Sequence, residues 1–175
     1  MFLMQVSNIK GSFRFEPTIE NFNKLVTQET FTLKWYKNFT VLRARFVYVI
    51  FWTSGYVNVT KIRDQSEIPE VFEEFRTLTK ISPSSKFKIH NIHAFGKLEK
   101  ALDLHKLHQS IRLLEEKEST RIFFNPSFFH GLKIYNERGT FLLFQSGKYS
   151  FLGCKSRKDL LKLADSICAL MNKLS

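Results

Sequence analysis

Apolar residues follow two different spacings along this chain, one typical of strands and one typical of helices. In residues 140–145, Phe141 and Leu143 would fall on one side of an extended strand, and Leu142 and Phe144 on the other. In residues 157–173 the apolar positions instead recur every three or four residues, which is the period of an amphipathic helix. The hydrophobic pattern therefore predicts a mixture of strands and helices.

The predicted elements come in the same order in both halves of the chain. The first half predicts a strand at 2–13, a helix at 18–27, strands at 30–36, 39–44, 46–52 and 56–61, and a helix at 66–79. The second half predicts a strand at 86–97, a helix at 101–116, strands at 119–124, 131–136, 140–145 and 149–154, and a helix at 157–173. Short connections favour antiparallel pairing, so we predict an α+β fold with a large antiparallel sheet.

The two halves also share short motifs. Ser54-Gly55 and Ser146-Gly147 lie 92 residues apart in a chain of 175, and Ser7-Asn8-Ile9 corresponds to His90-Asn91-Ile92. Such a long-period duplication predicts two pseudo-symmetric repeats, 1–82 and 83–175, within one continuous body. We expect Ser66 to cap the helix at 66–79, and Ser156 with Asp159 to cap the helix at 157–173.

Both faces of the predicted sheet are apolar. In strand 46–52, three apolar side chains (Val47, Val49, Phe51) oppose three others (Tyr48, Ile50, Trp52). Two long helices cover only one face, so the other is expected to dock a partner. The alternatives are a second layer formed by the short helices, or a homodimer.

Charge narrows the class of partner. The formal net charge is +11, divided into +3 for residues 1–85 and +8 for residues 86–175. This balance favours a polyanion or an acidic protein surface as the partner. Cys154 and Cys168 have no metal-binding or redox spacing, and the short apolar run at residues 1–4 is neither a signal peptide nor a membrane span.

Catalytic and metal-binding motifs are not indicated. His105 and His108 are close in sequence to each other, as are His90 and His93, but no cysteine or carboxylate completes a ligand set. The sequence has no glycine-rich phosphate loop and no nucleophile elbow. We therefore expect no enzyme activity, no metal and no cofactor.

Four motifs follow one another in the second half of the chain. They are Phe87-Lys-Ile-His-Asn-Ile92, Pro126-Ser-Phe-Phe-His-Gly-Leu132, Phe144-Gln-Ser-Gly-Lys148 and Gly153-Cys-Lys155. In this order the motifs resemble the core domain of the TATA-binding protein family. The first repeat matches more faintly, through Ser7-Asn8-Ile9, Ser54-Gly55 and Asn58-Val-Thr60. The resemblance implies a saddle of two β-α-β-β-β-β-α repeats, with helices on the convex face and a concave sheet that binds and bends DNA in the minor groove.

The resemblance also implies which residues meet DNA. Two aromatic pairs would enter base steps, Phe39 with Trp52 and Phe129 with Phe144, and two central amides, Asn8 and Asn91, would read A·T acceptors. The remaining groove-facing positions would be Lys10, Ile50, Asn58, Thr60, His93, Leu142, Ser150 and Leu152. Lys10, His93, Asn58, Ser150 and Leu152 depart from the family, which has valine or threonine at those places, so this face is more polar than the family pattern.

The expected partners are A·T-rich double-stranded DNA and transcription or chromatin proteins, in the nucleus or wherever the transcription machinery resides. Four basic residues, Lys155, Arg157, Lys158 and Lys162, lie where the family's convex helices meet regulators. The alternative function is a diverged saddle that has lost DNA and serves as a protein interaction module, with a homodimer possible when no DNA is bound. A third possibility, a regulatory appendage of a nucleic-acid enzyme, is disfavoured because we see no second domain in the chain.

Overall fold

The structure is a computed structural model that describes residues 3–26, 32–112 and 120–172. It divides into two compact units. The N-terminal unit comprises Asn8–His90, and the C-terminal unit comprises the chain from Asn91 onward together with Ser7 and the described residues before it. Thus β1 (Gln5–Arg14) and β6 (Lys88–Lys97) each contribute residues to both units. The repeat boundary near residue 82 stays a prediction.

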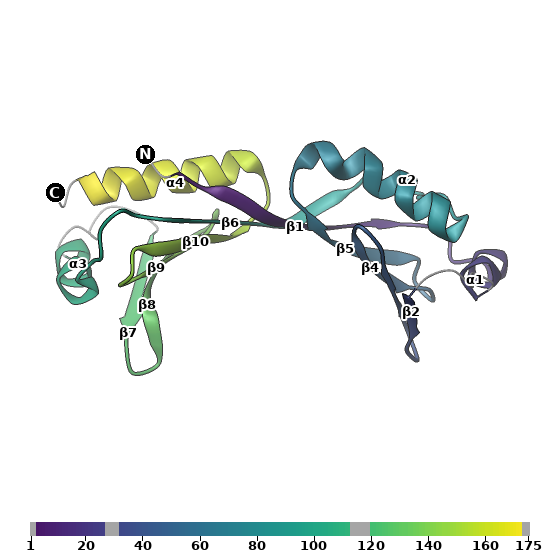
Figure 1. The fold of residues 1–175 in the computed structure, drawn as a ribbon, viewed down its shortest axis with the longest axis horizontal. Coiled ribbons are helices and arrows are strands. Elements are labelled where there is room, and N and C mark those ends of the chain that lie inside the picture. The colour runs from purple at the N-terminus through teal and green to yellow at the C-terminus, as the bar shows by residue number, and fades with distance from the viewer. Residues whose placement is uncertain (1–2, 27–31, 113–119, 173–175) are drawn as a thin grey trace. The chain divides into compact units, whose positions relative to one another are not determined.

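Each unit contains four further strands, a short helix and a long helix (Figure 1). The N-terminal unit holds α1 (Ile19–Val26), β2 (Thr32–Trp35), β3 (Thr40–Arg43), β4 (Val47–Phe51), β5 (Tyr56–Ile62), the 3-10 turn η1 (Gln65–Glu67) and α2 (Ile68–Thr79). The C-terminal unit holds α3 (Leu104–Arg112), β7 (Arg121–Asn125), β8 (Phe129–Asn136), β9 (Gly139–Phe144), β10 (Lys148–Cys154) and α4 (Arg157–Asn172). The predicted order of elements, repeated in the two halves, is confirmed.

The strands are hydrogen-bonded in the order β2-β3-β4-β5-β1-β6-β10-β9-β8-β7. Hairpin neighbours such as β4 and β5, or β9 and β10, pair antiparallel. The predicted α+β class with antiparallel pairing is therefore confirmed.

In the N-terminal unit, the core lies between the strands and α2. Phe75 of α2 packs edge-on against Phe13 of β1 with ring centroids 4.9 Å apart, and it lies 5.7 Å from Tyr48 of β4. The Tyr48 hydroxyl donates to the carbonyl of Val71 on α2 at 3.0 Å, and burial raises the pKa of Tyr48 above its ordinary value. One face of this half-sheet is therefore covered by α2.

In the C-terminal unit, α4 covers the corresponding face. The helix buries Leu160, Leu163, Ala164 and Ile167 against strand side chains that are themselves fully buried. Those strand side chains are Leu132, Ile134, Phe141, Leu143, Tyr149 and Phe151. Leu161, the neighbour of Leu160 on this helix, is not buried, because its side chain is 46% exposed.

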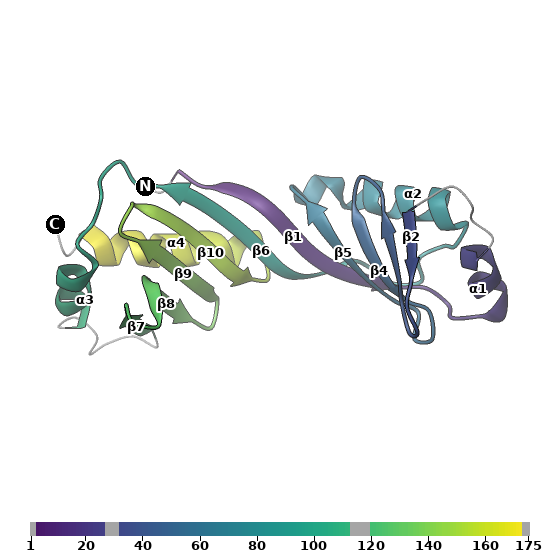
Figure 2. The same cartoon turned by 60° about the horizontal axis from the view of Figure 1, so that its bottom comes forward.

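The other face of each half-sheet is not covered by the long helix of its unit (Figure 2). In β4, and from Thr140 to Phe144 in β9, half-buried residues on this face alternate with buried residues on the helix-covered face. We call this side of the N-terminal unit its open face, and likewise for the C-terminal unit. Among the described residues, α3 does not form the second layer considered from the sequence, because it contacts β7 and β8 at the edge of its half-sheet.

The two long helices begin differently. For α4, the Ser156 hydroxyl accepts the N–H of Asp159 at 3.0 Å and donates to its carboxylate at 2.6 Å, as expected from the sequence. The prediction that Ser66 caps the other helix is wrong. The Asp64 carboxylate accepts the N–H of Ser66 at 2.9 Å, and the Glu67 carboxylate accepts the N–H of Asp64 at 3.2 Å. These two bonds form a capping box at the start of η1, one 3-10 turn before α2.

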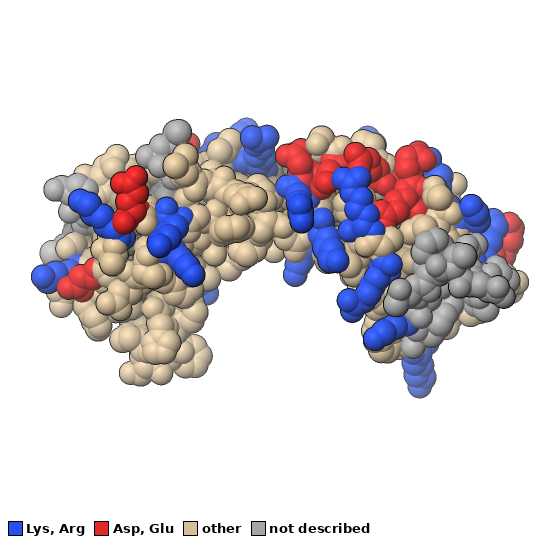
Figure 3. All heavy atoms as spheres, viewed as in Figure 1, with Lys and Arg blue, Asp and Glu red and all other residues tan. Residues whose placement is uncertain are grey.

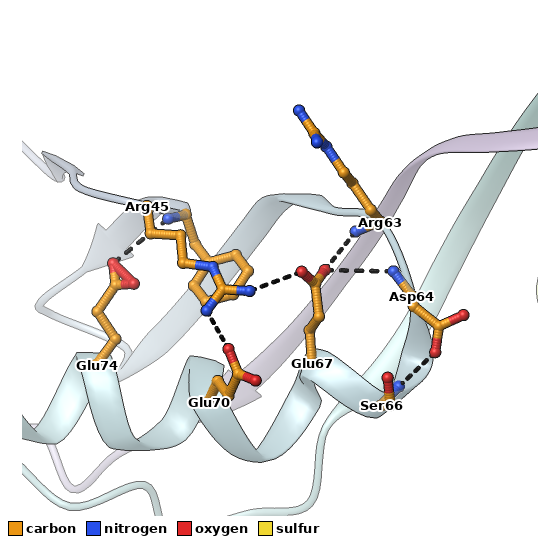
Figure 4. A network of polar contacts seen from close by, with 8 residues as sticks. Arg45, Arg63, Asp64, Ser66, Glu67, Glu70 and Glu74 are labelled. Atoms are coloured by element: carbon orange, nitrogen blue, oxygen red, sulfur yellow. Dashed lines mark hydrogen bonds and ion pairs between the residues drawn. The ribbon is translucent and has the colours of Figure 1, made fainter.

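Glu67 also anchors the turn between β3 and β4 (Figure 4). Its carboxylate accepts the N–H of Arg63 at 2.7 Å and pairs with the Arg45 guanidinium at 2.8 Å, while Arg45 also pairs with Glu70. The N–H groups of Arg63 and Asp64 and the charge of Arg45 hold the pKa of Glu67 below its ordinary value. The Arg45 guanidinium is therefore neutralised by acids of the protein itself.

No helix in the described residues is long and apolar enough to cross a lipid bilayer.

Glu67→Gln should flatten the acid dependence of stability. A carboxylate with a lowered folded-state pKa stabilises the fold above its unfolded pKa of about 4.3, and that contribution is lost as the pH falls through the folded value. Glutamine keeps an acceptor but does not titrate. We expect the thermal midpoint, measured by circular dichroism, to fall less between pH 5 and pH 3 in the variant than in the wild type. Glu99→Gln changes an exposed carboxylate that has no ion pair among the described residues; it serves as the control and should keep the wild-type slope.

Candidate functional site

The open face of the C-terminal unit presents a row of paired residues that crosses five strands. From β6 to β7 the row reads Phe95, Ser150, Leu142, Lys133 and Phe123. Phe95 and Phe123 are 42% and 40% exposed, whereas the three central side chains are half-buried. This row is therefore largely apolar but carries one cation, Lys133.

Two phenylalanines lie together on this face at the end of β9. The rings of Phe129 and Phe144 meet edge-to-face with centroids 5.8 Å apart, so the predicted pairing of these residues is present. Gly131 makes room for them. A Cβ atom at this position would lie 2.8 Å from Phe129 Cε1 and 3.0 Å from Phe144 Cε1.

The open face of the N-terminal unit presents the equivalent row with smaller side chains. From β1 to β2 this row reads Ser12, Asn58, Val49, Val41 and Lys34. At the end of β4 the aromatic pair is Phe39 with Phe51, whose ring centroids are 5.6 Å apart. The Tyr36 ring stacks on the Phe39 ring, with centroids 4.5 Å apart.

The predicted placements of Ile50 and Trp52 on this face are wrong. Ile50 is 0% exposed and faces α2, while Trp52 lies beyond β4 and packs against Phe22 of α1 at 5.1 Å. The indole Nε1 of Trp52 is buried without a hydrogen-bond partner among the described residues. The residues that occupy the two places are Val49 and Phe51.

The error comes from the length of one turn. Residues 52–55 connect β4 to β5, whereas residues 145–147 connect β9 to β10, so the first hairpin has one additional residue. Aligning the repeats by their Ser-Gly pairs therefore shifts β4 by one position. A shift of one residue moves every side chain of a strand to the opposite face.

Two asparagines occupy equivalent places beside β-bulges. Asn8 Oδ1 accepts the N–H of Lys61 at 2.9 Å, and Asn91 Oδ1 accepts the N–H of Gly153 at 2.6 Å. Lys61 and Gly153 both have left-handed backbones, with φ of 71° and 79°. Because a backbone N–H requires an acceptor, each amide is fixed with its oxygen inward, which leaves its NH₂ group as the donor available to a ligand.

Two histidines lie near these amides. Ser7 Oγ is 3.0 Å from His93 Nδ1 in the C-terminal unit. In the N-terminal unit, His90 Nε2 lies 2.6 Å from Ser12 Oγ and 3.1 Å from Tyr56 Oη.

The remaining predicted residues lie on the open faces and are at least partly accessible. Lys10 is exposed, and the others are half-buried; they are Asn58, Thr60, Leu142, Ser150 and Leu152. Sequence reasoning missed several open-face residues, among them Val41, Val47, Phe95, Lys133 and Tyr135. Alternation of side chains along the strands, counted with the correct length of the turn at 52–55, would have predicted most of them.

A hollow of about 520 Å³ opens on the C-terminal unit. It is lined by Phe123, Phe128, Phe129, Lys133, Tyr135, Thr140, Leu142 and Leu152. Phe128, at the tip between β7 and β8, is 84% exposed.

The four predicted partner-binding residues lie on the opposite side of this unit. Lys155, Arg157, Lys158 and Lys162 are exposed at the start of α4 and have no ion pair among the described residues. Figure 3 shows that acidic side chains gather over α2 of the N-terminal unit, where Glu70 and Glu73 are exposed. His105 and His108 of α3 pack on the ring of Phe124 at 4.9 and 5.6 Å.

Comparison with known proteins identifies relatives of this chain. Residues 86–174 match the family model described as transcription factor TFIID, or TATA-binding protein. The TATA-box-binding protein of Pyrodictium occultum is 31% identical over 100 residues, which are 56% of this chain and 46% of that relative. The match thus spans about half the length of the relative. The structure of Methanococcus jannaschii TBP is similar with a TM-score of 0.74 and 21% identity, covering 97% of this chain and 98% of that one.

Gly131→Ala should separate the Phe129 and Phe144 rings. The added methyl group would crowd both rings, and Phe129 is only half-buried, so its ring can shift toward solvent. We expect the nuclear Overhauser contacts between the two rings to disappear. They should persist in His130→Ala, which changes an exposed neighbour on the same strand. Unchanged contacts in the glycine variant would contradict the close packing at this site.

Proposed function

Because the chain belongs to the TATA-binding protein family, we propose that it binds A·T-rich duplex DNA in the minor groove and bends it. The open faces of both units are the proposed contact surface, and transcription initiation is the proposed role. The antiparallel fold, shared with Methanococcus jannaschii TBP over 97% of the chain, supports this proposal.

The orientation of the two asparagine amides is the observation that carries the proposal. The side-chain oxygens of Asn8 and Asn91 each accept a backbone N–H, so their NH₂ groups remain as donors. The minor groove of an A·T pair offers only acceptors, namely adenine N3 and thymine O2. Two amide donors at equivalent places therefore suit the minor groove of A·T pairs. They suit G·C pairs less well, because the guanine N2 amino group is itself a donor in that groove.

The aromatic pairs supply a means of bending. Apolar side chains that enter a base step unstack it and kink the duplex toward the major groove. Each unit offers one such pair at a strand end, Phe39 with Phe51 and Phe129 with Phe144. The polar open-face residues remain compatible with a groove, since Lys10 and Asn58 carry donors.

Proteins with acidic surfaces are the proposed partners of α4. Arg157 and Lys158 lie in the first turn of α4, where the helix dipole disfavours cations by about 0.3–1 kcal/mol each. Leu161, 46% exposed, lies among them. Exposed cations beside an exposed leucine form a surface suited to an acidic, partly apolar partner.

A protein interaction module remains the second candidate function. The polar residues Lys10, His93, Asn58 and Ser150 interrupt the apolar open faces, and Phe128 is 84% exposed at a hairpin tip. Failure of the folded protein to bind duplex DNA, even at low salt, would favour this candidate.

Removing either aromatic pair should reduce DNA bending. We expect the wild type to bind a duplex with a central TA step in fluorescence anisotropy and to bend it in a fluorescence energy-transfer assay. The double variants Phe129→Ala with Phe144→Ala, and Phe39→Ala with Phe51→Ala, should bind more weakly and bend less. Trp52→Ala is the matched aromatic control and should bend normally, because its ring packs on α1. If Trp52→Ala lost the bend and Phe51→Ala kept it, the aromatic pair of the N-terminal unit would be assigned wrongly.

Asn91→Asp should weaken binding without unfolding the protein. Aspartate keeps an oxygen for the N–H of Gly153 but replaces the outward donor with a negative oxygen facing groove acceptors. We expect a loss of about 1–3 kcal/mol in binding free energy, the range of a base contact. Asn136→Asp is the matched control, because Asn136 likewise accepts a backbone N–H, from Arg138 at 2.9 Å, in the β8–β9 turn. Equal losses in both variants would show a general charge effect instead of a groove contact.

A further inference from the structure

Lys133 is a cation in a largely apolar hollow. It lies on the open face of the C-terminal unit, paired with Leu142 on one side and Phe123 on the other. Its Nζ is 4.8 Å from the ring centroid of Tyr135, so the ammonium group rests over an aromatic face. The hollow of about 520 Å³ is otherwise formed mainly by phenylalanine and leucine side chains.

No acidic side chain among the described residues pairs with Lys133. The Lys133 side chain is only half-buried, so in the free protein it remains open to solvent water. A ligand that covers the hollow removes this water, and a desolvated charge is costly unless the ligand supplies an opposite charge. The occupant must therefore combine apolar contact surface with an anion.

The N-terminal unit has no such cation in the same place. Lys133 pairs with Leu142, which pairs with Ser150, and the corresponding row has Val41 paired with Val49 and Asn58. Position 41 thus carries valine where position 133 carries lysine. The two open faces are equivalent in backbone but differ in charge at this point.

We propose that Lys133 binds one backbone phosphate of the duplex from a position that carries valine in the N-terminal unit. Deoxyribose edges supply apolar contact surface, and the phosphate beside them supplies the anion that the hollow requires. This inference rests on the proposed function, because it names a contact made by duplex DNA on the same open face.

The salt dependence of DNA binding tests the contact directly. One phosphate contact contributes about 0.9 to the slope of log K against log [salt]. We expect Lys133→Val, which installs the residue of the equivalent position, to lower the slope by about 0.9 and to weaken binding about eightfold at 0.1 M salt. Lys133→Arg should keep the wild-type slope. Lys162→Ala, which removes the same charge from α4 of the same unit, should change the slope little.

A chemical change in the DNA identifies the phosphate. Replacing single phosphates of the duplex by neutral methylphosphonates should reveal one position where the wild type loses affinity and Lys133→Val loses no more. That non-additivity locates the contact, as in a double-mutant cycle.

The outcomes separate the two proposals. An unchanged salt slope in Lys133→Val, with duplex binding intact, overturns the phosphate contact and leaves the proposed function standing. Equal slope changes in Lys133→Val and Lys162→Ala also overturn it, because they report overall charge only. If the folded wild type binds no duplex at all, the proposed function fails and the contact fails with it.

Discussion

The alternation of side chains along each strand is the constraint on which the rest of this structure depends. A long helix packs on one face of each half-sheet, so every second strand residue is buried and every other one is left for a ligand. The boundary between core and contact surface therefore runs along each strand and is set residue by residue. An additional residue in the turn at 52–55 moved Ile50 into the core and brought Val49 and Phe51 to the open face.

This alternation is interrupted at two β-bulges, and each bulge contacts an asparagine side chain. Each bulge places a left-handed residue, Lys61 or Gly153, next to an asparagine that accepts its N–H. The bulge residue is thus hydrogen-bonded to an asparagine whose NH₂ group is still able to donate to a ligand. The recurrence of this arrangement at equivalent places in both units supports a ligand that presents similar acceptors twice.

Duplication of a backbone does not require duplication of its chemistry. The same paired row carries Asn58, Val49 and Val41 in one unit, but Ser150, Leu142 and Lys133 in the other. These substitutions change charge and volume on the open faces while leaving the strand pairing intact. The proposed phosphate contact of Lys133 follows from this asymmetry, since the equivalent valine makes no ionic contact.

The sequence by itself determined the elements and their duplicated order, because helix and strand periods are local properties of the chain. It also predicted the Ser156–Asp159 cap and the pairing of Phe129 with Phe144. Only the tertiary structure decided which face each residue of β4 occupies, the packing of Trp52 against Phe22 and the ion pairs of Arg45. Each of these features depends on the length of a turn or on contacts between elements that are distant in sequence. The local hydrophobic period contains no information about either.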